Sequence, residues 1–380
     1  MVIVSLYGLV NAALVCVLTY RLESQLRRSK IKQQYPAPTE LPTVSVCIPA
    51  RNETHAMTQC LERVLSSDYP KMEVVVFDDE SADDTSVLIK SFASSGVRFV
   101  PGVGLPDGWL GKNHALETLA REASGTYVIF LDVDTHIQVA TISQLVNCMT
   151  GEDLRMLSVI PGRNDIWRPS VLFGHMRYYW EIVLSRESVP ATASSLWMIH
   201  RRTFLSTIGG LTSHKADVEP EEHIAALIGA RAYRCLVNDR NLGVTYEKRW
   251  QSQIETSRRL LYPMVGGTPQ RAAMAVGALA LLNLPTIIIA SGLFTGWDVM
   301  HTVATIAGGL FALVYCRYTY AVWRSNWWMG VIAWPVVILQ ELALMMSSVV
   351  GYARQTITWK GRPVMSPKLA RQLERAEANE

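Results

Sequence analysis

Apolar residues are unevenly distributed along the 380-residue chain, and four stretches contain almost nothing else. These stretches cover residues 2–20, 272–294, 301–316 and 328–350. A helix needs about 20 apolar residues to cross a bilayer. The first, second and fourth stretches reach this length, and the third does so when it is extended to 299–318. The pattern therefore predicts an N-terminal transmembrane anchor over 1–22 and C-terminal transmembrane helices over 272–352.

Between these stretches the pattern changes to short β-rich runs that end on polar residues. Such runs occupy 44–49, 74–77 and 127–131, and a helical spacing at 56–65 separates the first two. Strands that alternate with helices form parallel sheets, and such sheets bind ligands at the carboxyl ends of their strands. We therefore expect residues 36–250 to form an α/β domain with a mostly parallel central sheet.

The run over 127–131 is followed by two carboxylates one residue apart, Asp132 and Asp134. Alternate side chains of a strand point to the same side, so both carboxylates face one point. Mg²⁺ and Mn²⁺ prefer oxygen ligands, and Mg²⁺ is usually held by one or two carboxylates together with substrate phosphates. The pair predicts a Mg²⁺ or Mn²⁺ site that binds a diphosphate, although two acids after a strand also occur in turns and helix caps.

Four motifs in a fixed order carry a resemblance to a known family. They are Pro49-Ala-Arg-Asn-Glu53, Asp78-Asp-Glu-Ser-Ala-Asp-Asp-Thr85, Gly111-Lys-Asn-His-Ala115 and Phe130-Leu-Asp-Val-Asp-Thr135. In this order they resemble the inverting nucleotide-sugar glycosyltransferases of family 2, which have the GT-A fold. The Gly-Trp-Leu-Gly-Lys sequence at 108–112 resembles the branch that acts on carotenoid, hopanoid and ceramide-like lipids. The resemblance covers residues 44 to about 234.

The resemblance implies which residues bind the donor, which in this family is usually a UDP-sugar held with a divalent cation. Asp79, with Asp78 beside it, corresponds to the acid that holds the uracil or the ribose. Asp134 corresponds to the direct metal ligand, and Asp132 is its partner. The full set of implied donor-binding residues is Pro49, Arg51, Glu53, Asp78, Asp79, Lys112 and Asp132.

Two of these motifs leave alternatives open. The spacing after Ser81 departs from the commonest form of the family, so Asp83 and Asp84 are both candidates for its last acid, and this segment is also typical of a helix cap. Lys112 stands near the start of a predicted helix, where the helix dipole disfavours a cation. A bound diphosphate would remove that conflict, whereas a lysine that is merely exposed is the alternative.

An inverting transfer needs a carboxylate that deprotonates the acceptor hydroxyl. The resemblance implies an acidic pair at the start of a helix, and the segment 216–234 occupies the corresponding part of the chain. Its alignment assigns Glu221 as the catalytic base, with Glu222 next to it and His223 as a rival. The alternative is that the two glutamates are first-turn acids favoured by the helix dipole.

Three residues are acceptor-side candidates: Trp180, Trp197 and Arg259. Trp180 belongs to an aromatic-rich segment, 163–186, which fits either an apolar acceptor channel or an ordinary packed helix. Trp197 precedes a turn that resembles the acceptor-side Gly-Gly turn of the family. Arg259 lies in the segment 251–271, which is predicted to be an amphipathic interfacial helix, with a core-facing helix as the alternative.

Basic residues set the expected orientation in the membrane. The net charge of +3 is concentrated beside the apolar stretches, which favours anionic lipid headgroups as partners over nucleic acid. The basic residues of 21–32 predict, by the positive-inside rule, that residues 36–250 are cytoplasmic in an inner (plasma) membrane protein. Four spans would return the basic tail over 353–380 to the outside, so either one segment is re-entrant or interfacial or the rule fails. Pro285 and Pro335 mark the two segments most able to break.

The six cysteines have no metal-ligand spacing, which fits a reduced cytosolic domain and not a structural zinc site. Taken with the resemblance, the sequence predicts a multi-pass membrane enzyme that transfers a sugar from a nucleotide diphosphate to a lipid hydroxyl. Two alternatives stay open. One is a polyprenyl-phosphate sugar transferase, and the other is a catalytically silent relative that binds nucleotide sugar or lipid.

Overall fold

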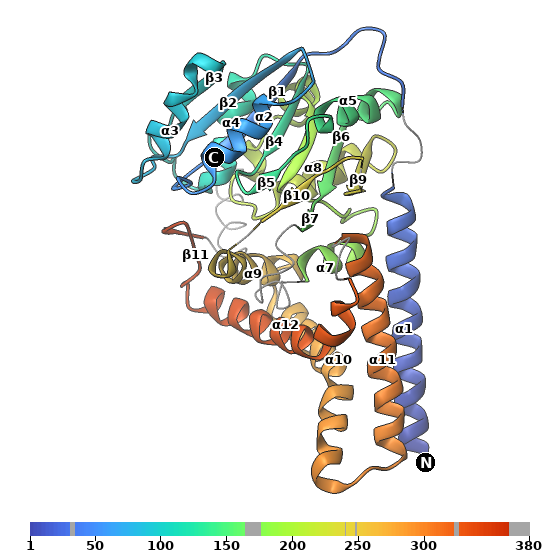
Figure 1. Ribbon diagram of the computed structural model, residues 1–380. Helices are drawn as coiled ribbons and strands as arrows, with labels where there is room; N and C mark the ends of the chain where they lie inside the picture. The colour runs from blue at the N-terminus through green and yellow to red at the C-terminus, as the bar shows by residue number, and fades with distance from the viewer. Residues whose placement is uncertain (31–34, 164–175, 240, 248, 323–326, 365–380) are drawn as a thin grey trace. The chain divides into compact units, whose positions relative to one another are not determined.

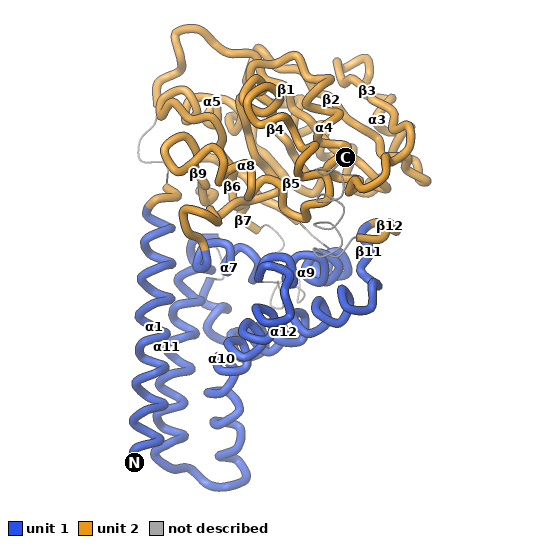
Figure 2. The backbone as a smooth tube through the Cα atoms, turned by 180° about the vertical axis from the view of Figure 1, so that it is seen from behind, with its two compact units in different colours: residues 1–27, 165–184, 248–359 blue, residues 28–164, 185–247, 360–380 orange. Residues whose placement is uncertain are grey.

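The computed structural model describes residues 1–30, 35–163, 176–239, 241–247, 249–322 and 327–364. The chain divides into two compact units, shown in different colours in Figure 2. The sheet unit comprises residues 28–164, 185–247 and 360–380. The helical unit comprises residues 1–27, 165–184 and 248–359.

The sheet unit is built on a seven-stranded sheet with the order β3-β2-β1-β4-β8-β6-β9 (Figure 1). Strands β3, β2, β1 and β4 run parallel, β8 is antiparallel to both of its neighbours, and β6 and β9 are again parallel. This confirms the expected mostly parallel sheet. The strands are β1 (Val44–Ala50), β2 (Met72–Asp78), β3 (Val97–Pro101), β4 (Tyr127–Leu131), β6 (Met156–Ile160), β8 (Leu196–His200) and β9 (Tyr233–Val237).

Helices cover both faces of this sheet, because alternate strand residues pack into two different hydrophobic clusters. In β1, Val46 and Ile48 belong to one cluster, whereas Cys47 belongs to the other. The helices of the unit are α2 (Met57–Leu65), α3 (Thr85–Ser91), α4 (Gly111–Glu122), α5 (Thr141–Gly151) and α8 (Pro220–Ile228). A small second sheet joins β5 (Thr135–His136), β10 (Thr245–Tyr246) and β7 (Gly162–Arg163).

The helical unit contains four helices that are long and apolar enough to cross a membrane, in the part of the chain that the structure describes. They are α1 (Val2–Arg28), α10 (Pro269–Thr295), α11 (Val299–Val322) and α12 (Met329–Ala353). Each predicted apolar stretch falls in one of them. Pro285 and Pro335 both lie inside continuous helices, so neither proline ends its segment. The unit also contains α7 (Arg177–Leu184), α9 (Trp250–Met264) and β11 (Thr358–Trp359), and β12 (Arg362–Pro363) follows in the sheet unit.

Within the helical unit, α12 runs across α10 and α11, whereas α1, α10 and α11 run along one another (Figure 1). Its first turns meet α11, where the Trp334 ring lies 5.6 Å from that of Tyr315. Its middle meets α10, where Asn283 donates to the Ile338 carbonyl at 3.1 Å. Its last turns meet α9, where the Ser348 hydroxyl accepts from a backbone N–H at 3.0 Å. Helix α12 therefore contacts α11, α10 and α9 in turn and does not pack against α11 along its whole length.

Candidate active site

The loops after β1 and β2 are bound to each other by hydrogen bonds between side chains and backbone. The backbone N–H of Asn52 donates to the Ser81 hydroxyl at 2.9 Å, and the Asn52 side chain accepts from the N–H of Ala82 at 2.9 Å. The N–H of Glu53 donates to the Thr85 hydroxyl at 2.8 Å. The first two sequence motifs therefore form one connected structure at the carboxyl edge of the sheet.

Asp83 stabilises the same structure. It accepts from the N–H and the hydroxyl of Thr85 at 3.1 and 2.5 Å, and from the N–H of Thr54 at 3.3 Å. Burial acts to raise its pKa, but these hydrogen bonds outweigh burial and lower the pKa to about 2. Asp84 is exposed and makes no side-chain cap bond to α3. Of the two acids left open by the sequence, Asp83 is the one that caps the segment.

Asp78 is the last residue of β2, Asp79 follows it, and both are buried. Asp78 accepts from the Ser86 hydroxyl. Asp79 faces Arg51, which donates to its carbonyl oxygen and lies 3.9 Å from its carboxylate. Burial raises the pKa of Asp79, opposed by neighbouring arginines. Pro49, the remaining motif residue here, lies in β1 in register with Phe77 of β2, so it contributes backbone geometry.

Lys112 lies in the first turn of α4 and is paired with Asp132 at the end of β4. Its Nζ donates to Asp132 Oδ1 at 2.6 Å and to the Ser194 carbonyl at 3.3 Å. Only 13 % of the lysine side chain is exposed, so the alternative of a merely exposed lysine is wrong. The carboxylate offsets the unfavourable interaction between a cation and the helix N-terminus.

Two further carboxylates, those of Glu53 and Asp134, lie near the Asp132 carboxylate of this pair. Burial raises the pKa of Glu53, and the nearby charges of Asp134 and Asp132 raise it further, while Lys360 opposes them. Asp132 and Asp134 are both half-buried. Mutual repulsion among acids in a partly buried site is relieved by a divalent cation, and an all-oxygen donor set suits Mg²⁺ or Mn²⁺. The residues present therefore fit such a cation.

A second group of acids lies at the start of α8. Glu221 is only 2 % exposed, whereas Glu222 is half-buried. Burial, followed by the charges of Glu219, Glu221 and Asp217, raises the pKa of Glu222 to about 8, with Arg186 opposing. Glu222 can therefore carry a proton near neutral pH and still reach solvent.

The start of α4 fixes the loop that precedes α8. The Asn113 side chain donates to the carbonyls of His214, Lys215 and Asp217 at 3.1, 3.2 and 2.8 Å. Asn113 directly follows Lys112 in the chain. The second acid group therefore belongs to the same edge of the sheet as the pair formed by Lys112 and Asp132.

His214, Asp217 and His223 form a compact group that could also be considered for a metal ion. Asp217 Oδ2 lies 2.7 Å from His214 Nδ1 and 3.2 Å from His223 Nδ1. Ligands at tetrahedral zinc, about 2.0–2.1 Å from the ion, lie about 3.3 Å apart. The 2.7 Å between His214 and Asp217 is too short for two zinc ligands and fits a hydrogen bond. Asp217 therefore orients the two imidazole rings, which stack with their centroids 5.1 Å apart.

The three acceptor-side candidates have different surroundings. Trp197 is 0 % exposed on β8, 4.2 Å from the ring of Phe130. The expectation that it contacts the acceptor is wrong, because it is a core residue of the sheet unit. Trp180 hydrogen-bonds to Glu341 within the helical unit. Arg259, in α9 of the same unit, lies over the Trp359 ring at 5.2 Å. Two further aromatics of the segment, Trp167 and Phe173, lie outside the described residues.

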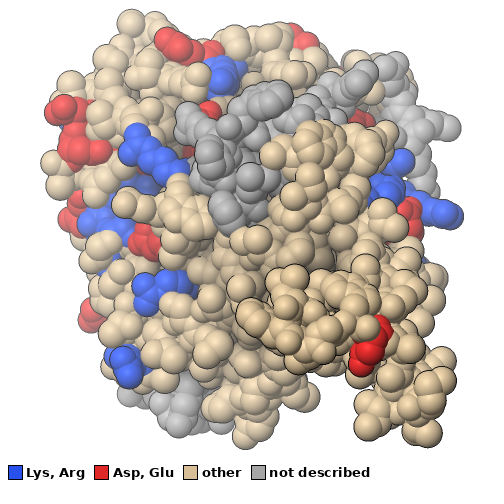
Figure 3. All heavy atoms as spheres, turned by 60° about the horizontal axis from the view of Figure 1, so that its bottom comes forward, with Lys and Arg blue, Asp and Glu red and all other residues tan. Residues whose placement is uncertain are grey.

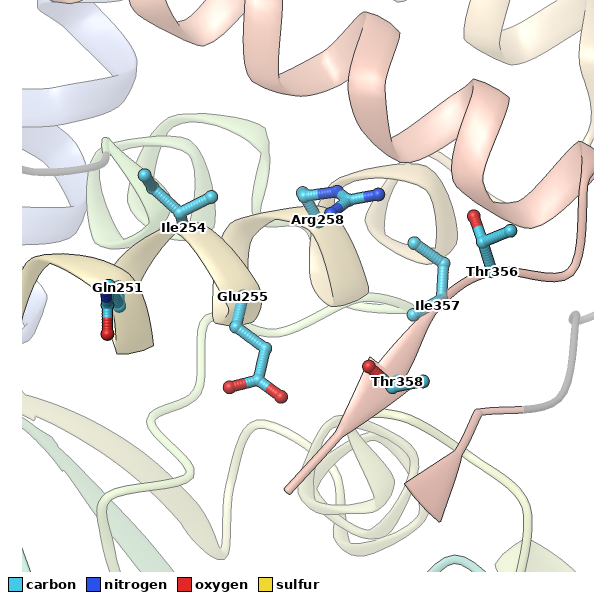
Figure 4. Close-up of a pocket in the computed structure, with 7 residues that line it drawn as sticks. All are labelled: Gln251, Ile254, Glu255, Arg258, Thr356, Ile357 and Thr358. Carbon is cyan, nitrogen blue, oxygen red and sulfur yellow. The ribbon is translucent and has the colours of Figure 1, made fainter. Parts of the chain in front are cut away.

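Two features were not anticipated from the sequence. The first is a pocket of about 240 Å³ in the helical unit, between α9 and the segment after α12 (Figure 4). The second is the contact of Lys360 with Glu53 and of Arg362 with Asp79. Both cations lie in the C-terminal basic tail, whose sequence indicates only membrane topology. The signal available was a pair of basic residues flanking Gly361, which is too common a pattern to predict a site.

A mainly parallel sheet with paired acids and a lysine at its carboxyl edge is the arrangement expected of the GT-A class of glycosyltransferases. The sequence model of glycosyl transferase family 2 matches residues 45–202. The chain therefore contains a family 2 glycosyltransferase domain, and the matched residues belong to the sheet unit except for 165–184, which belong to the helical unit.

Curated relatives agree with this assignment. A UDP-Glc:α-D-GlcNAc-diphosphoundecaprenol β-1,3-glucosyltransferase of Escherichia coli is 30% identical over 46% of this chain and 66% of its own length. A 4,4′-diaponeurosporenoate glycosyltransferase of Staphylococcus aureus is 29% identical over 27% of each chain. The chain spans between 26% and 66% of the length of the first curated relatives that it matches.

Among solved structures, a mannosyltransferase of Pyrobaculum calidifontis in complex with GDP-Man and Mn²⁺ superimposes with a TM-score of 0.56. The match covers 92% of this chain and 98% of that one, at 20% sequence identity. This likeness shows a shared fold.

Proposed function

We propose that this enzyme transfers a sugar from a UDP-sugar to a hydroxyl of a membrane lipid or lipid-linked sugar, with inversion at the anomeric carbon. The observation that carries the proposal is the meeting of Glu53, Asp79, Lys112, Asp132 and Asp134 at one edge of the sheet. Parallel α/β sheets bind their ligands at this edge. Acids together with a lysine suit a cation-bound diphosphate better than a neutral ligand.

Asp134 and Asp132 would hold Mg²⁺ or Mn²⁺, and Glu53 lies beside them. The cation would supply positive charge that neutralises the diphosphate of the leaving nucleotide. The P. calidifontis mannosyltransferase, whose structure contains GDP-Man and Mn²⁺, supports a divalent cation without deciding between the two ions. Lys112, paired with Asp132, adds a fixed cation at the start of α4.

Glu222 is the proposed general base, and burial, followed by the charges of neighbouring acids that include the buried Glu221, raises its pKa. The base takes the proton of the acceptor hydroxyl as the hydroxyl oxygen bonds to the anomeric carbon. The bond from that carbon to the diphosphate oxygen breaks on the opposite face, and the nucleotide leaves with the bonding electron pair. A base whose pKa is close to the working pH is the most effective one.

The lipid acceptor is supported by two independent facts. The E. coli and S. aureus relatives carry names that state a diphosphoundecaprenol-linked and a carotenoid-type acceptor. The helical unit of this chain contains four helices with membrane-compatible length and composition. Figure 3 shows a face whose centre is almost free of charged side chains, which lie mainly at its margins.

The proposal is tested by incubating the enzyme, reconstituted in vesicles, with lipid extracts and a panel of labelled nucleotide sugars. Label from one UDP-sugar that mild acid does not release as the free monosaccharide, because a glycosidic bond joins it to a hydroxyl, supports the proposal. Release of the label by mild acid as the free monosaccharide would instead support a polyprenyl-phosphate acceptor, the alternative in which the acceptor needs no base. Binding without transfer to any lipid in the panel would support the catalytically silent relative.

In the proposed topology α1, α10 and α11 cross the membrane and α12 lies in the interface. The last turns of α12 are hydrogen-bonded to α9: Ser348 donates to the Arg258 carbonyl at 2.6 Å and Tyr352 to the Arg259 carbonyl at 2.7 Å. Charged residues are costly in the bilayer centre, which disfavours a deep position for the part of α12 joined to this helix.

The exposed face of α12 supports the same position. Its residues are all apolar and recur every three or four positions: Ile332, Val336, Leu339, Ala343, Met346 and Val350. An interfacial helix directs such a stripe into the acyl region. Three crossings leave the basic tail on the cytoplasmic side, so the conflict between four spans and the positive-inside rule disappears.

Cysteine labelling tests this topology. Single cysteines at Val103, Trp297 and Arg354, all exposed, are introduced after replacement of the exposed Cys16. A membrane-impermeant maleimide added to intact cells is expected to label position 297 alone. Labelling of position 354 from outside would require α12 to cross, and labelling of position 103 would reverse the orientation.

A further inference from the structure

A turn near the C-terminal end of the described chain contacts the acids of the proposed donor site. Lys360 donates through Nζ to the Arg51 carbonyl at 2.9 Å and to a Glu53 carboxylate oxygen. Arg362 Nη1 donates to both carboxylate oxygens of Asp79, at 2.9 and 2.7 Å. These partners are separated from the turn by about 280 to 310 positions in the chain. Both residues lie in the sheet unit, so the contact is internal to it.

The ion pairs are partly buried. The Arg362 side chain is 19 % exposed and its partner Asp79 is 6 % exposed. Arg362 Nη2 also donates to Glu80 at 2.8 Å, so two consecutive carboxylates hold one guanidinium. Fixed arginines of this kind bind phosphate well, because the planar group is already oriented.

Gly111 provides the space that the guanidinium needs. A Cβ at this position would lie 2.9 Å from Asp79 Oδ2 and 3.0 Å from Arg362 Nη1. Gly111 begins α4, and the next residue is Lys112. The glycine of the Gly-Lys motif therefore allows a tail cation to lie beside the helix that carries Lys112.

Charge explains why this edge needs cations from the tail. Six carboxylates gather here: Glu53, Asp78, Asp79, Glu80, Asp132 and Asp134. The motifs themselves supply only Arg51 and Lys112 as positive partners. A nucleoside diphosphate is itself an anion, and one divalent cation does not reverse such an excess of negative charge. Lys360 and Arg362 reduce this excess of negative charge at Glu53 and Asp79, which follow β1 and β2.

We propose that Lys360 and Arg362 are donor-binding residues that bring positive charge to the diphosphate of the nucleotide sugar. The inference rests on the proposed function, because it assumes that the donor binds at this edge. The glutamate and aspartate partners orient the two cations before the donor arrives. The tail beyond the last helix therefore belongs to the donor site.

The test is calorimetry on the full-length protein in detergent, with UDP and with UMP in the presence of Mn²⁺. Arg362→Ala is expected to weaken UDP binding at least about tenfold, the loss typical of one hydrogen bond between charged groups. UMP, which lacks the second phosphate, should lose less. The affinity of the variant for UDP should also depend less on salt than that of the wild type.

Arg354→Ala is the matched control, because Arg354 is an exposed arginine of the helical unit. Arg362→Lys, which keeps the charge, should restore part of the UDP affinity. Unchanged UDP binding in Arg362→Ala would overturn the inference, and tighter binding would do so too, since Arg362 would then compete with the nucleotide. An equal loss for UDP and UMP would also overturn it, because the arginine would only stabilise the structure. If the wild type binds neither nucleotide, the proposed donor site itself fails.

Discussion

Two acid-rich loops follow strands of the same sheet, and the structure gives them different tasks. After β2, Asp78 and Asp83 accept hydrogen bonds from hydroxyl groups, and Asp83 also accepts from backbone N–H groups. After β4, Asp132 is paired with a lysine and lies with Asp134 close enough to Glu53 to raise its pKa. The first loop uses much of its acceptor capacity to hold itself together, whereas the second concentrates negative charge that a cation would relieve.

The difference shows that an acidic motif has no single meaning. Carboxylates that accept several protein N–H groups have a lowered pKa and stabilise the fold, as Asp83 does. Carboxylates that face other carboxylates raise one another's pKa at the expense of stability, and this arrangement is typical of functional sites. Substitutions in the two loops should therefore separate binding from stability.

The largest effect is expected for Asp134→Ala. If the acids after β4 hold the divalent cation, the variant should bind UDP in the presence of Mn²⁺ more than about 100-fold more weakly than the wild type. A loss of this size exceeds that expected from removing a residue that only hydrogen-bonds to a metal ligand. Calorimetry with UDP and Mn²⁺ measures this, and Asp107→Ala, at an exposed aspartate, is the control. Unchanged affinity in a folded Asp134→Ala protein would remove the metal assignment and with it the contrast between the loops.

The next effect concerns the acids at the start of α8. Glu222→Gln should keep UDP binding and reduce transfer to a lipid acceptor by at least about 100-fold, the lower end of what a positioned general base contributes. Glu62→Gln, on an exposed face of α2, is the control. Glu221→Gln and His223→Gln are measured in parallel. A loss confined to Glu221→Gln would restore the order of candidates that the sequence favoured.

The pH dependence follows from the same group. A general base must be deprotonated to act, and the pKa of Glu222 is raised to about 8. The rate of transfer should therefore fall about tenfold per pH unit below this value and level off above it. Because neighbouring acids contribute, the apparent pKa belongs to the whole group. A rate that stays constant from pH 6 to 9 while chemistry limits turnover would contradict this role.

The sequence predicted the sheet and the donor-side acids because both depend on local pattern. Strand runs ending in polar residues specify the carboxyl edge, and Asp132 needs only the end of β4 to reach it. Trp197 was assigned wrongly because its neighbours Phe130 and Phe204 come from other elements, so nothing local indicates burial. The contacts of Lys360 and the crossing of α12 over its neighbours depend on tertiary packing, which hydrophobic periodicity does not specify.

The smallest effect should come from the first loop, and it should be on stability. Asp83→Ala removes the acceptor for two backbone N–H groups and a hydroxyl, a loss similar to that of a helix cap, about 1–2 kcal/mol. UDP affinity should remain nearly unchanged. Asp84→Ala is the matched control, since Asp84 makes no cap bond.

The pH dependence of that stability loss gives the deciding measurement. The pKa of Asp83 is lowered to about 2 in the folded protein, below its ordinary value near 4. Its stabilisation is therefore fully present above pH 4 and decreases as the pH falls toward 2. Thermal unfolding of wild type and Asp83→Ala should differ at pH 7 and converge on acidification. A difference that persists unchanged at low pH would mean that Asp83 acts through packing. A loss of UDP binding without a loss of stability would mean that the loop after β2 binds the donor through this acid.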